Sequence, residues 1–178
     1  MSQLITEKTL TRIEAVLFLA REPLPGRRLL QLADVPEGMR IRGLVKKLNS
    51  RYNSRTSAFR IYEVAGGFQL RTRPHFVTWL ARLHSAPLEI CLSTSALETL
   101  TIIAHKQPIL RATVEKIRGV QCGEFLRQLM EQDLIKITGK TNDLGRPFLY
   151  GTTKRFLQLF GINRIEEILS ENTEKSTE

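Results

Sequence analysis

Apolar residues in the first half of the chain recur with the spacing of amphipathic helices. The spacing predicts three helices, around residues 10–20, 27–33 and 41–52, separated by prolines and glycines that interrupt helical structure. In the third helix the apolar positions follow i, i+3, i+4, i+7 and i+11, and they are Ile41, Leu44, Val45, Leu48 and Tyr52. In the first helix the predicted apolar face is made of Leu10, Ile13, Leu17 and Ala20, widened by Val16 and Phe18.

After the third helix the pattern changes to that of two short strands. Apolar residues predict one strand over residues 59–64 and a returning strand over residues 68–70. The pair Gly66-Gly67 between them is typical of a hairpin turn. Pro74 then opens a short helix.

The second half of the chain repeats this order of elements. Ser95 and Glu98 have the spacing of a capping box, which predicts the start of a helix that Pro108 ends. A short helix over residues 111–118 is expected to stop at Gly119. A third helix is expected at residues 125–130. Two strands are expected at residues 134–137 and 148–150, with a turn between them at residues 142–145. Thr152 or Thr153 would then cap a last helix.

Three helices followed by a two-stranded hairpin is the order of a winged helix. Two such modules of roughly 80 residues fit a chain of 178 residues. We therefore predict an α+β fold, mainly α, with two tandem winged-helix domains over residues 1–84 and 93–169. Residues 85–92 would form a linker, and residues 170–178 a disordered polar tail.

Charge is distributed unevenly between the two halves. Residues 1–84 hold 15 Lys and Arg but 6 Asp and Glu, whereas residues 85–178 hold 12 of each kind, so the first half carries the whole net charge of +9. A basic half favours a nucleic acid or an acidic partner surface. A solvated surface with no partner is the alternative.

The sequence gives little support to catalysis. His75, His84 and His105 have no carboxylate or cysteine at metal-ligand spacing, and Cys91 and Cys122 lack CxxC partners. No P-loop and no dinucleotide-binding glycine pattern occurs. We therefore expect no enzymatic activity, no cofactor, no metal and no small-molecule substrate.

Nothing in the sequence indicates a membrane segment. The longest apolar run near the N-terminus covers residues 15–20, which is far too short to cross a bilayer. It is flanked by Glu14 and Arg21, so it does not have the form of a signal peptide. We expect a cytoplasmic protein that does not bind membranes.

Four stretches of the sequence resemble the family of segregation and condensation protein B, the accessory subunit of bacterial condensin. They are Ile13-Glu14-Ala15 with Leu17-Phe18, residues 64–74 (VAGGFQLRTRP), residues 95–120 (SALETL, then IAHKQPI and IRGV) and residues 145–153 (GRPFLYGTT). The resemblance runs from about residue 10 to about residue 168. It implies paired winged-helix domains, a homodimer formed through the first domain, and a nucleoid-associated role in chromosome condensation and segregation.

The resemblance also implies a set of partners. The chain would bind the kleisin subunit, segregation and condensation protein A, which in turn joins the structural-maintenance-of-chromosomes (SMC) ATPase. The second domain would offer a groove to apolar residues of an amphipathic kleisin segment. Our candidates for partner contact are Lys106, Gln107, Arg146 and Tyr150, although the sequence alone favours a plain turn at Lys106 and Gln107 and a structural wing and helix cap at residues 145–153.

A different function remains open because of the basic first half. The third helix of a DNA-binding winged helix enters the major groove, and here it carries basic residues away from its apolar stripe. The candidate DNA-binding residues are Arg27, Arg28, Arg40, Lys47 and Arg51. The alternative to the adaptor is therefore a tandem winged-helix transcriptional regulator that binds DNA, whose affinity should fall steeply with salt.

Overall fold

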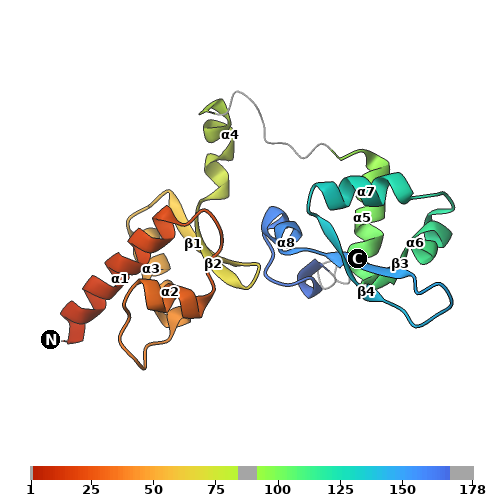
Figure 1. Ribbon diagram of the computed structural model, residues 1–178. Coiled ribbons are helices and arrows are strands. Elements are labelled where there is room, and N and C mark those ends of the chain that lie inside the picture. The colour runs from red at the N-terminus through yellow and green to blue at the C-terminus, as the bar shows by residue number, and fades with distance from the viewer. Residues whose placement is uncertain (1, 84–91, 169–178) are drawn as a thin grey trace, which may run out of the picture. The chain divides into compact units, whose positions relative to one another are not determined.

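The computed structural model describes residues 2–83 and 92–168 (Figure 1). The chain folds into two compact units, residues 1–87 and residues 88–178. The predicted tail, and the predicted linker apart from Leu92, lie outside the described residues.

The first unit is a winged helix. Its elements are α1 (Ser2–Leu19), α2 (Gly26–Leu32), α3 (Ile41–Ser54), β1 (Phe59–Val64) and β2 (Gly67–Thr72), followed by the short helices η1 (Pro74–Phe76), α4 (Val77–Leu80) and η2 (Ala81–Leu83). Strands β1 and β2 pair antiparallel, with Phe59 opposite Thr72. An isolated bridge joins Leu24, two residues before α2, to Phe68, so β2 lies between β1 and Leu24.

The second unit has the same order of elements. They are α5 (Thr94–Lys106), β3 (Ile109–Leu110), α6 (Arg111–Arg118), α7 (Gly123–Glu131), β4 (Ile135–Lys140), β5 (Phe148–Thr152) and α8 (Lys154–Phe160). The strand order is β3-β5-β4, and β3 holds the place that Leu24 holds in the first unit. The repeated arrangement confirms the predicted α+β fold of two winged-helix units.

Each unit has its own apolar core, built where the helical spacing predicted it. In the first unit the apolar sides of α1, α2 and α3 meet over the hairpin, and the core includes Leu10, Ile13, Leu17, Leu29, Leu44, Leu48, Tyr52, Ile61 and Phe68. In the second unit it includes Leu100, Ile103, Ala104, Val114, Leu126, Leu129, Leu134, Ile135, Tyr150 and Phe156. Burial of this apolar area is the main stabilising term for each unit.

Two details of the predicted secondary structure are wrong. The hairpin turn of the first unit is Ala65-Gly66, both with positive φ, whereas Gly67 opens β2. A Cβ on Gly67 would lie 2.8 Å from the backbone of Leu24, so this glycine permits a close approach of two chain segments and does not form the turn. The N-cap of α5 is Ser93, whose hydroxyl accepts a hydrogen bond from the amide of Ala96, and not Ser95.

Two other predicted helix boundaries are confirmed. Gly119 ends α6 with a left-handed conformation, φ 71°, which a residue without a Cβ adopts without strain. Thr153 is the cap of α8, since its hydroxyl accepts a hydrogen bond from the amide of Phe156.

Candidate partner-binding surfaces

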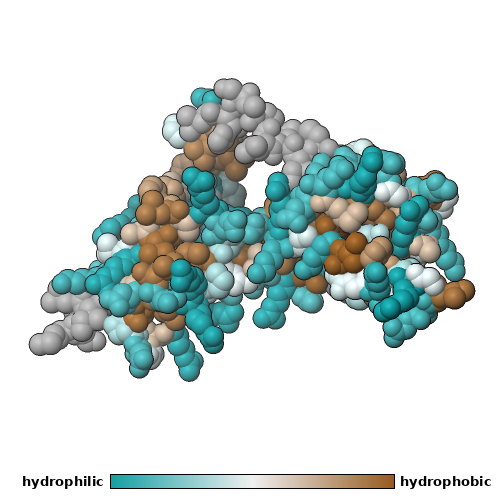
Figure 2. Space-filling view, in the orientation of Figure 1, coloured by the Kyte–Doolittle hydropathy of each residue, from teal (hydrophilic) through white to brown (hydrophobic). Residues whose placement is uncertain are grey.

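Helix α5 buries one side in the core of the second unit and presents the other to solvent. Ala96, Leu100, Ile103 and Ala104 are buried. Leu97 and Thr101, which lie four residues apart on the other side of the helix, are exposed. In the view of Figure 2, apolar side chains likewise reach the surface between polar ones.

One groove runs between α5 and α8 and encloses about 320 Å³. Leu97, Leu100, Thr101, Ala104, His105, Phe156, Phe160, Ile162 and Ile168 line this α5–α8 groove. Phe156 is buried and anchors α8, and its ring lies 4.5 Å from that of Phe160, centroid to centroid. Phe160 is 49% exposed, so its ring forms an apolar wall that solvent reaches.

A second groove lies on the other side of Leu97, between α5 and α6. Thr94, Leu97, Glu98, Thr101, Ile102, Ile117 and Arg118 line this α5–α6 groove. The Arg118 side chain is held in place, because one Nη donates to Thr99 Oγ1 and the other to Glu98 Oε2, each at 2.9 Å. Its guanidinium also lies 5.0 Å from the centre of the Phe125 ring.

Leu97 and Thr101 therefore form a ridge with a groove on each side. Leu97 is 45% exposed and Ile117 is 46% exposed, and both are apolar. Helical spacing marks Leu97 and Phe160 as apolar positions of their helices but does not separate core from surface. The apolar stripe of α5 includes Leu97, which the core does not bury. An apolar stripe wider than the core requires is the feature of the sequence that could have indicated a partner-binding surface.

The predicted partner-contact residues have different environments. Lys106 is exposed at the end of α5, and Arg146 is exposed in the loop that joins β4 to β5. Tyr150, by contrast, is 8% exposed and belongs to the core of the second unit. This placement corrects the expectation that Tyr150 contacts a partner, because its ring is already packed inside the unit.

Gln107 also has an internal role. Its Oε1 accepts hydrogen bonds from the backbone amide of Thr152 at 2.6 Å and from the Thr152 hydroxyl at 3.0 Å. Its Nε2 donates to the carbonyl of Ala104 at 3.3 Å. Gln107 therefore ties the end of α5 to β5, and its side-chain oxygen is already engaged within the unit.

The first unit carries an exposed apolar patch at the end of α1. Phe18 and Leu19 are 70% and 80% exposed, and Ala15 beside them is exposed as well. The prediction that Phe18 widens the buried face of α1 is therefore wrong. Large apolar side chains that are this exposed and adjacent are typical of a surface that another protein covers. We call Ala15, Phe18 and Leu19 the α1 patch.

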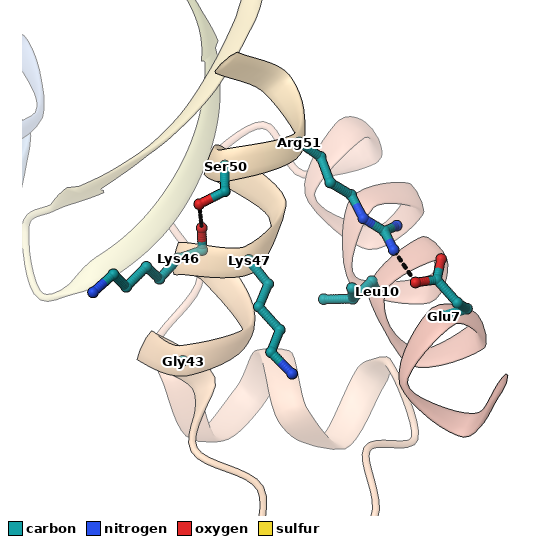
Figure 3. Close-up of a pocket in the computed structure, with 7 residues that line it drawn as sticks. All are labelled: Glu7, Leu10, Gly43, Lys46, Lys47, Ser50 and Arg51. Carbon is teal, nitrogen blue, oxygen red and sulfur yellow. Dashed lines mark hydrogen bonds and ion pairs between the residues drawn. The ribbon is translucent and has the colours of Figure 1, made fainter. Parts of the chain in front are cut away.

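A basic surface lies on α3, beside the first turns of α1. Glu7, Leu10, Gly43, Lys46, Lys47, Ser50 and Arg51 line an open pocket of about 800 Å³ there (Figure 3). Lys46 and Lys47 extend away from α3 in different directions. Arg51 instead turns to α1 and forms an ion pair with Glu7, so its charge is partly neutralised within the unit.

The remaining predicted DNA-binding residues are exposed. Arg40 is the N-cap residue of α3, and Arg27 and Arg28 lie in the first turn of α2. Arg28 donates a hydrogen bond to Gln31 one turn along, at 2.9 Å. The structure thus brings Arg40, Lys47 and Arg51 together along α3 and leaves two of these three charges without an ion pair among the described residues.

The described residues offer no arrangement for catalysis by a metal or a thiolate. No group of three or more His, Cys, Asp or Glu side chains in residues 2–83 and 92–168 could hold a metal ion. Cys122 is buried, and desolvation raises the pKa of its thiol, so the thiolate nucleophile is disfavoured. No helix within the described part of the chain is long and apolar enough to cross a membrane.

Comparison with known proteins identifies the family. The model of the family described as segregation and condensation complex subunit ScpB matches residues 11–170. The chain belongs to this ScpB family. It is 40% identical over 169 residues to segregation and condensation protein B of Syntrophotalea carbinolica, covering 93% of this chain and 84% of that one. It is 44% identical over 165 residues to the protein of the same name from Streptococcus pneumoniae (strain Hungary19A-6), covering 90% and 85%.

A solved structure is similar as well. The crystal structure of a conserved hypothetical protein from Chlorobium tepidum is 31% identical, covers 90% of this chain and 99% of that one, and gives a TM-score of 0.43. As a member of the ScpB family, the chain is an accessory subunit of a chromosome segregation and condensation complex. The resemblance inferred from the four sequence stretches is thereby confirmed.

Proposed function

We propose that this ScpB family member is a non-enzymatic, homodimeric adaptor that binds the kleisin subunit of its complex and, through the kleisin, the SMC ATPase. It would act in the cytoplasm, on the nucleoid. The observation that carries this proposal is the α5 ridge, where exposed Leu97 stands between two grooves lined by apolar residues. A ridge with grooves on either side fits the apolar side chains of an amphipathic segment.

The size of the expected contribution follows from the exposed apolar side chains. Leu97, Ile117 and Phe160 are each about half exposed. Fully burying such a side chain contributes about 1.5–3 kcal/mol, so covering the exposed half of each contributes about 1 kcal/mol. Leu97 lines both grooves, and its loss should therefore weaken the kleisin complex more than the loss of either neighbour.

The experiment compares two substitutions with the same chemistry in the same unit. Leu97→Glu places a carboxylate on the α5 ridge, whereas Ile137→Glu places one on β4, outside both grooves. Leu97 and Ile137 are 45% and 44% exposed, so neither change buries a charge in the core. The kleisin encoded in the same genome is titrated calorimetrically into each full-length variant.

We expect Leu97→Glu to weaken kleisin binding by about tenfold or more, because a desolvated carboxylate costs at least the energy of the lost apolar contact. Ile137→Glu should bind as the unmodified protein does. Equal binding by all three proteins would show that the kleisin does not use the α5 ridge and would remove the observation on which the proposal rests.

The homodimer is proposed to form through the α1 patch. Phe18 and Leu19 present adjacent apolar side chains to solvent, and a symmetric pair of such patches would cover both. Phe18→Glu combined with Leu19→Glu should convert a dimer to a monomer in light scattering without loss of helical circular dichroism. A variant that stays dimeric would exclude this patch as the dimer interface.

A further inference from the structure

The basic residues of the first unit differ in whether an acidic side chain neutralises them. Arg12, Arg42 and Arg51 form ion pairs with Asp34, Glu63 and Glu7, respectively. Arg40, Lys46 and Lys47 form no ion pair with any described acidic residue, and all three are exposed. Three positive charges without an ion pair among the described residues therefore lie together on the outward side of α3.

The centre of this surface carries no large side chain. Gly43 lies in α3 with Lys46, Lys47 and Ser50 at i+3, i+4 and i+7, so these residues surround it on one face of the helix. The Ser50 hydroxyl turns back and donates to the carbonyl of Lys46 at 3.0 Å (Figure 3). We call Arg40, Gly43, Lys46, Lys47 and Ser50 the α3 basic face.

The fold does not require a glycine at position 43. A Cβ built on Gly43 would meet nothing within 4 Å, and its backbone is ordinary helix. Glycine in a helix interior is less favourable than alanine, so this position gives up helix stability without relieving a clash. What the missing side chain provides is room for another molecule to approach the helix closely between the two lysines.

Two hollows meet at this point of α3. The pocket of about 800 Å³ and a smaller one of about 230 Å³, lined by Met39, Arg40, Gly43, Leu44 and Lys47, share Gly43 and Lys47. The carboxylate in the larger pocket belongs to Glu7 and is already paired with Arg51. A negatively charged ligand would therefore meet three free cations and no unpaired carboxylate among the residues that line these pockets.

We propose that the α3 basic face binds the phosphate backbone of double-stranded DNA without regard to sequence, a function separate from kleisin binding. Helix α3 holds the position that enters DNA in winged-helix proteins, and its outward side chains here are cationic or small. A protein partner is less suited, because protein interfaces have an apolar or aromatic centre and the exposed side chains of this face, Arg40, Lys46, Lys47 and Ser50, include none.

Salt dependence measures the number of phosphate contacts. Three contacts predict that the logarithm of the affinity falls with the logarithm of the salt concentration with a slope of about −2.7. Lys46→Ala combined with Lys47→Ala should reduce the slope to about −0.9 and weaken binding about tenfold or more at 0.1 M salt. Fluorescence anisotropy of the full chain with two unrelated duplexes of about 30 base pairs tests this, and both duplexes should bind equally.

A matched control removes the same charge from the second unit. Lys116→Ala combined with Lys154→Ala changes two exposed lysines of α6 and α8 and should leave the slope unchanged. Gly43→Glu, which adds a carboxylate to an open position, should abolish binding while circular dichroism stays that of the folded protein.

Three results would overturn the proposal. The first is no binding of either duplex at 50 mM salt. The second is an equal loss of affinity in the two double variants, which would mean that overall charge and not the α3 basic face attracts DNA. The third is unchanged DNA binding by Lys46→Ala/Lys47→Ala together with a weaker kleisin complex, which would assign the face to an acidic protein segment.

Discussion

Gln107 allows a structural role to be separated from a partner-binding role by one substitution. Its side-chain oxygen accepts two hydrogen bonds from Thr152, and its amide nitrogen donates a longer one to Ala104. Gln107→Ala removes all three bonds and leaves the backbone amide of Thr152 without its acceptor. Lys106→Ala, one residue earlier, removes an exposed side chain that forms no ion pair with a described residue.

The magnitude follows from the geometry of these bonds. The bond from the Thr152 amide to Gln107 is short at 2.6 Å, and the bond from the Thr152 hydroxyl, at 3.0 Å, is within the usual range. Each contributes about 1 kcal/mol net, so Gln107→Ala should destabilise the second unit by about 2 kcal/mol. A loss of that size corresponds to an increase of about 30-fold in the population of the open form.

Hydrogen exchange measures this opening unit by unit. The single tryptophan, Trp79, lies in the first unit, so tryptophan fluorescence would not report on the second. In Gln107→Ala, peptides from α5 and β5 should exchange about 30-fold faster, and peptides from the first unit should be unchanged. Lys106→Ala should exchange as the unmodified protein does.

Gln107→Glu provides a partial rescue, because a carboxylate oxygen can accept both bonds from Thr152. Exchange in Gln107→Glu should therefore lie between that of Gln107→Ala and that of the unmodified protein. If Gln107→Ala left exchange unchanged but weakened kleisin binding, Gln107 would be a partner contact and its assignment to the fold would be refuted.

Two further predictions concern the first unit. Burial raises the pKa of Tyr52, and the hydrogen bond to Glu14 raises it further. The folded state therefore holds the phenolic proton more tightly than the unfolded chain does. The resulting contribution to the free energy of unfolding is fully present below about pH 10 and is lost as the pH rises above it. Absorbance titration should show a tyrosine ionisation that lags, and Tyr52→Phe should remove it; a titration curve that Tyr52→Phe leaves with the same late component would contradict the assignment. Gly67→Ala should destabilise the unit by about 1–3 kcal/mol, because its Cβ would meet the backbone of Leu24 at 2.8 Å, whereas Gly43→Ala should stabilise it by about 1 kcal/mol. Thermal denaturation compares the two, and a shift of both in the same direction would refute this account of the glycines.

The sequence was enough to predict the fold because the helical and strand periods are clear and occur twice. The apolar stripe of α3 was predicted residue by residue, and Leu44, Val45, Leu48 and Tyr52 are buried as expected. The positions that failed depend on contacts between distant segments. Gly67 is set by the approach of Leu24, which lies far from it in the sequence and which the local pattern Gly66-Gly67 does not reveal.

Surface sites were predicted less well for a related reason. Helical spacing shows which face of a helix is apolar but not how much of that face the rest of the unit covers. Phe18 and Leu97 both belong to apolar stripes, yet they are 70% and 45% exposed. Polar residues were misjudged in the opposite direction, since Gln107 and the hydroxyl of Tyr150 suggested an accessible site, whereas Gln107 bonds within the fold and Tyr150 is in the core.

The central claim, that this chain is the kleisin-binding adaptor of its complex, is tested most directly by the mass of the assembled complex. The chain is purified together with the kleisin from the same genome, and the mass is determined by light scattering in high salt, where contacts that depend on phosphate or surface charge are weakened. The account predicts a stable complex whose mass equals one kleisin and two chains of 20.4 kDa. Separate elution of the two proteins in high salt, with DNA as the ligand that this chain retains in low salt, would contradict it.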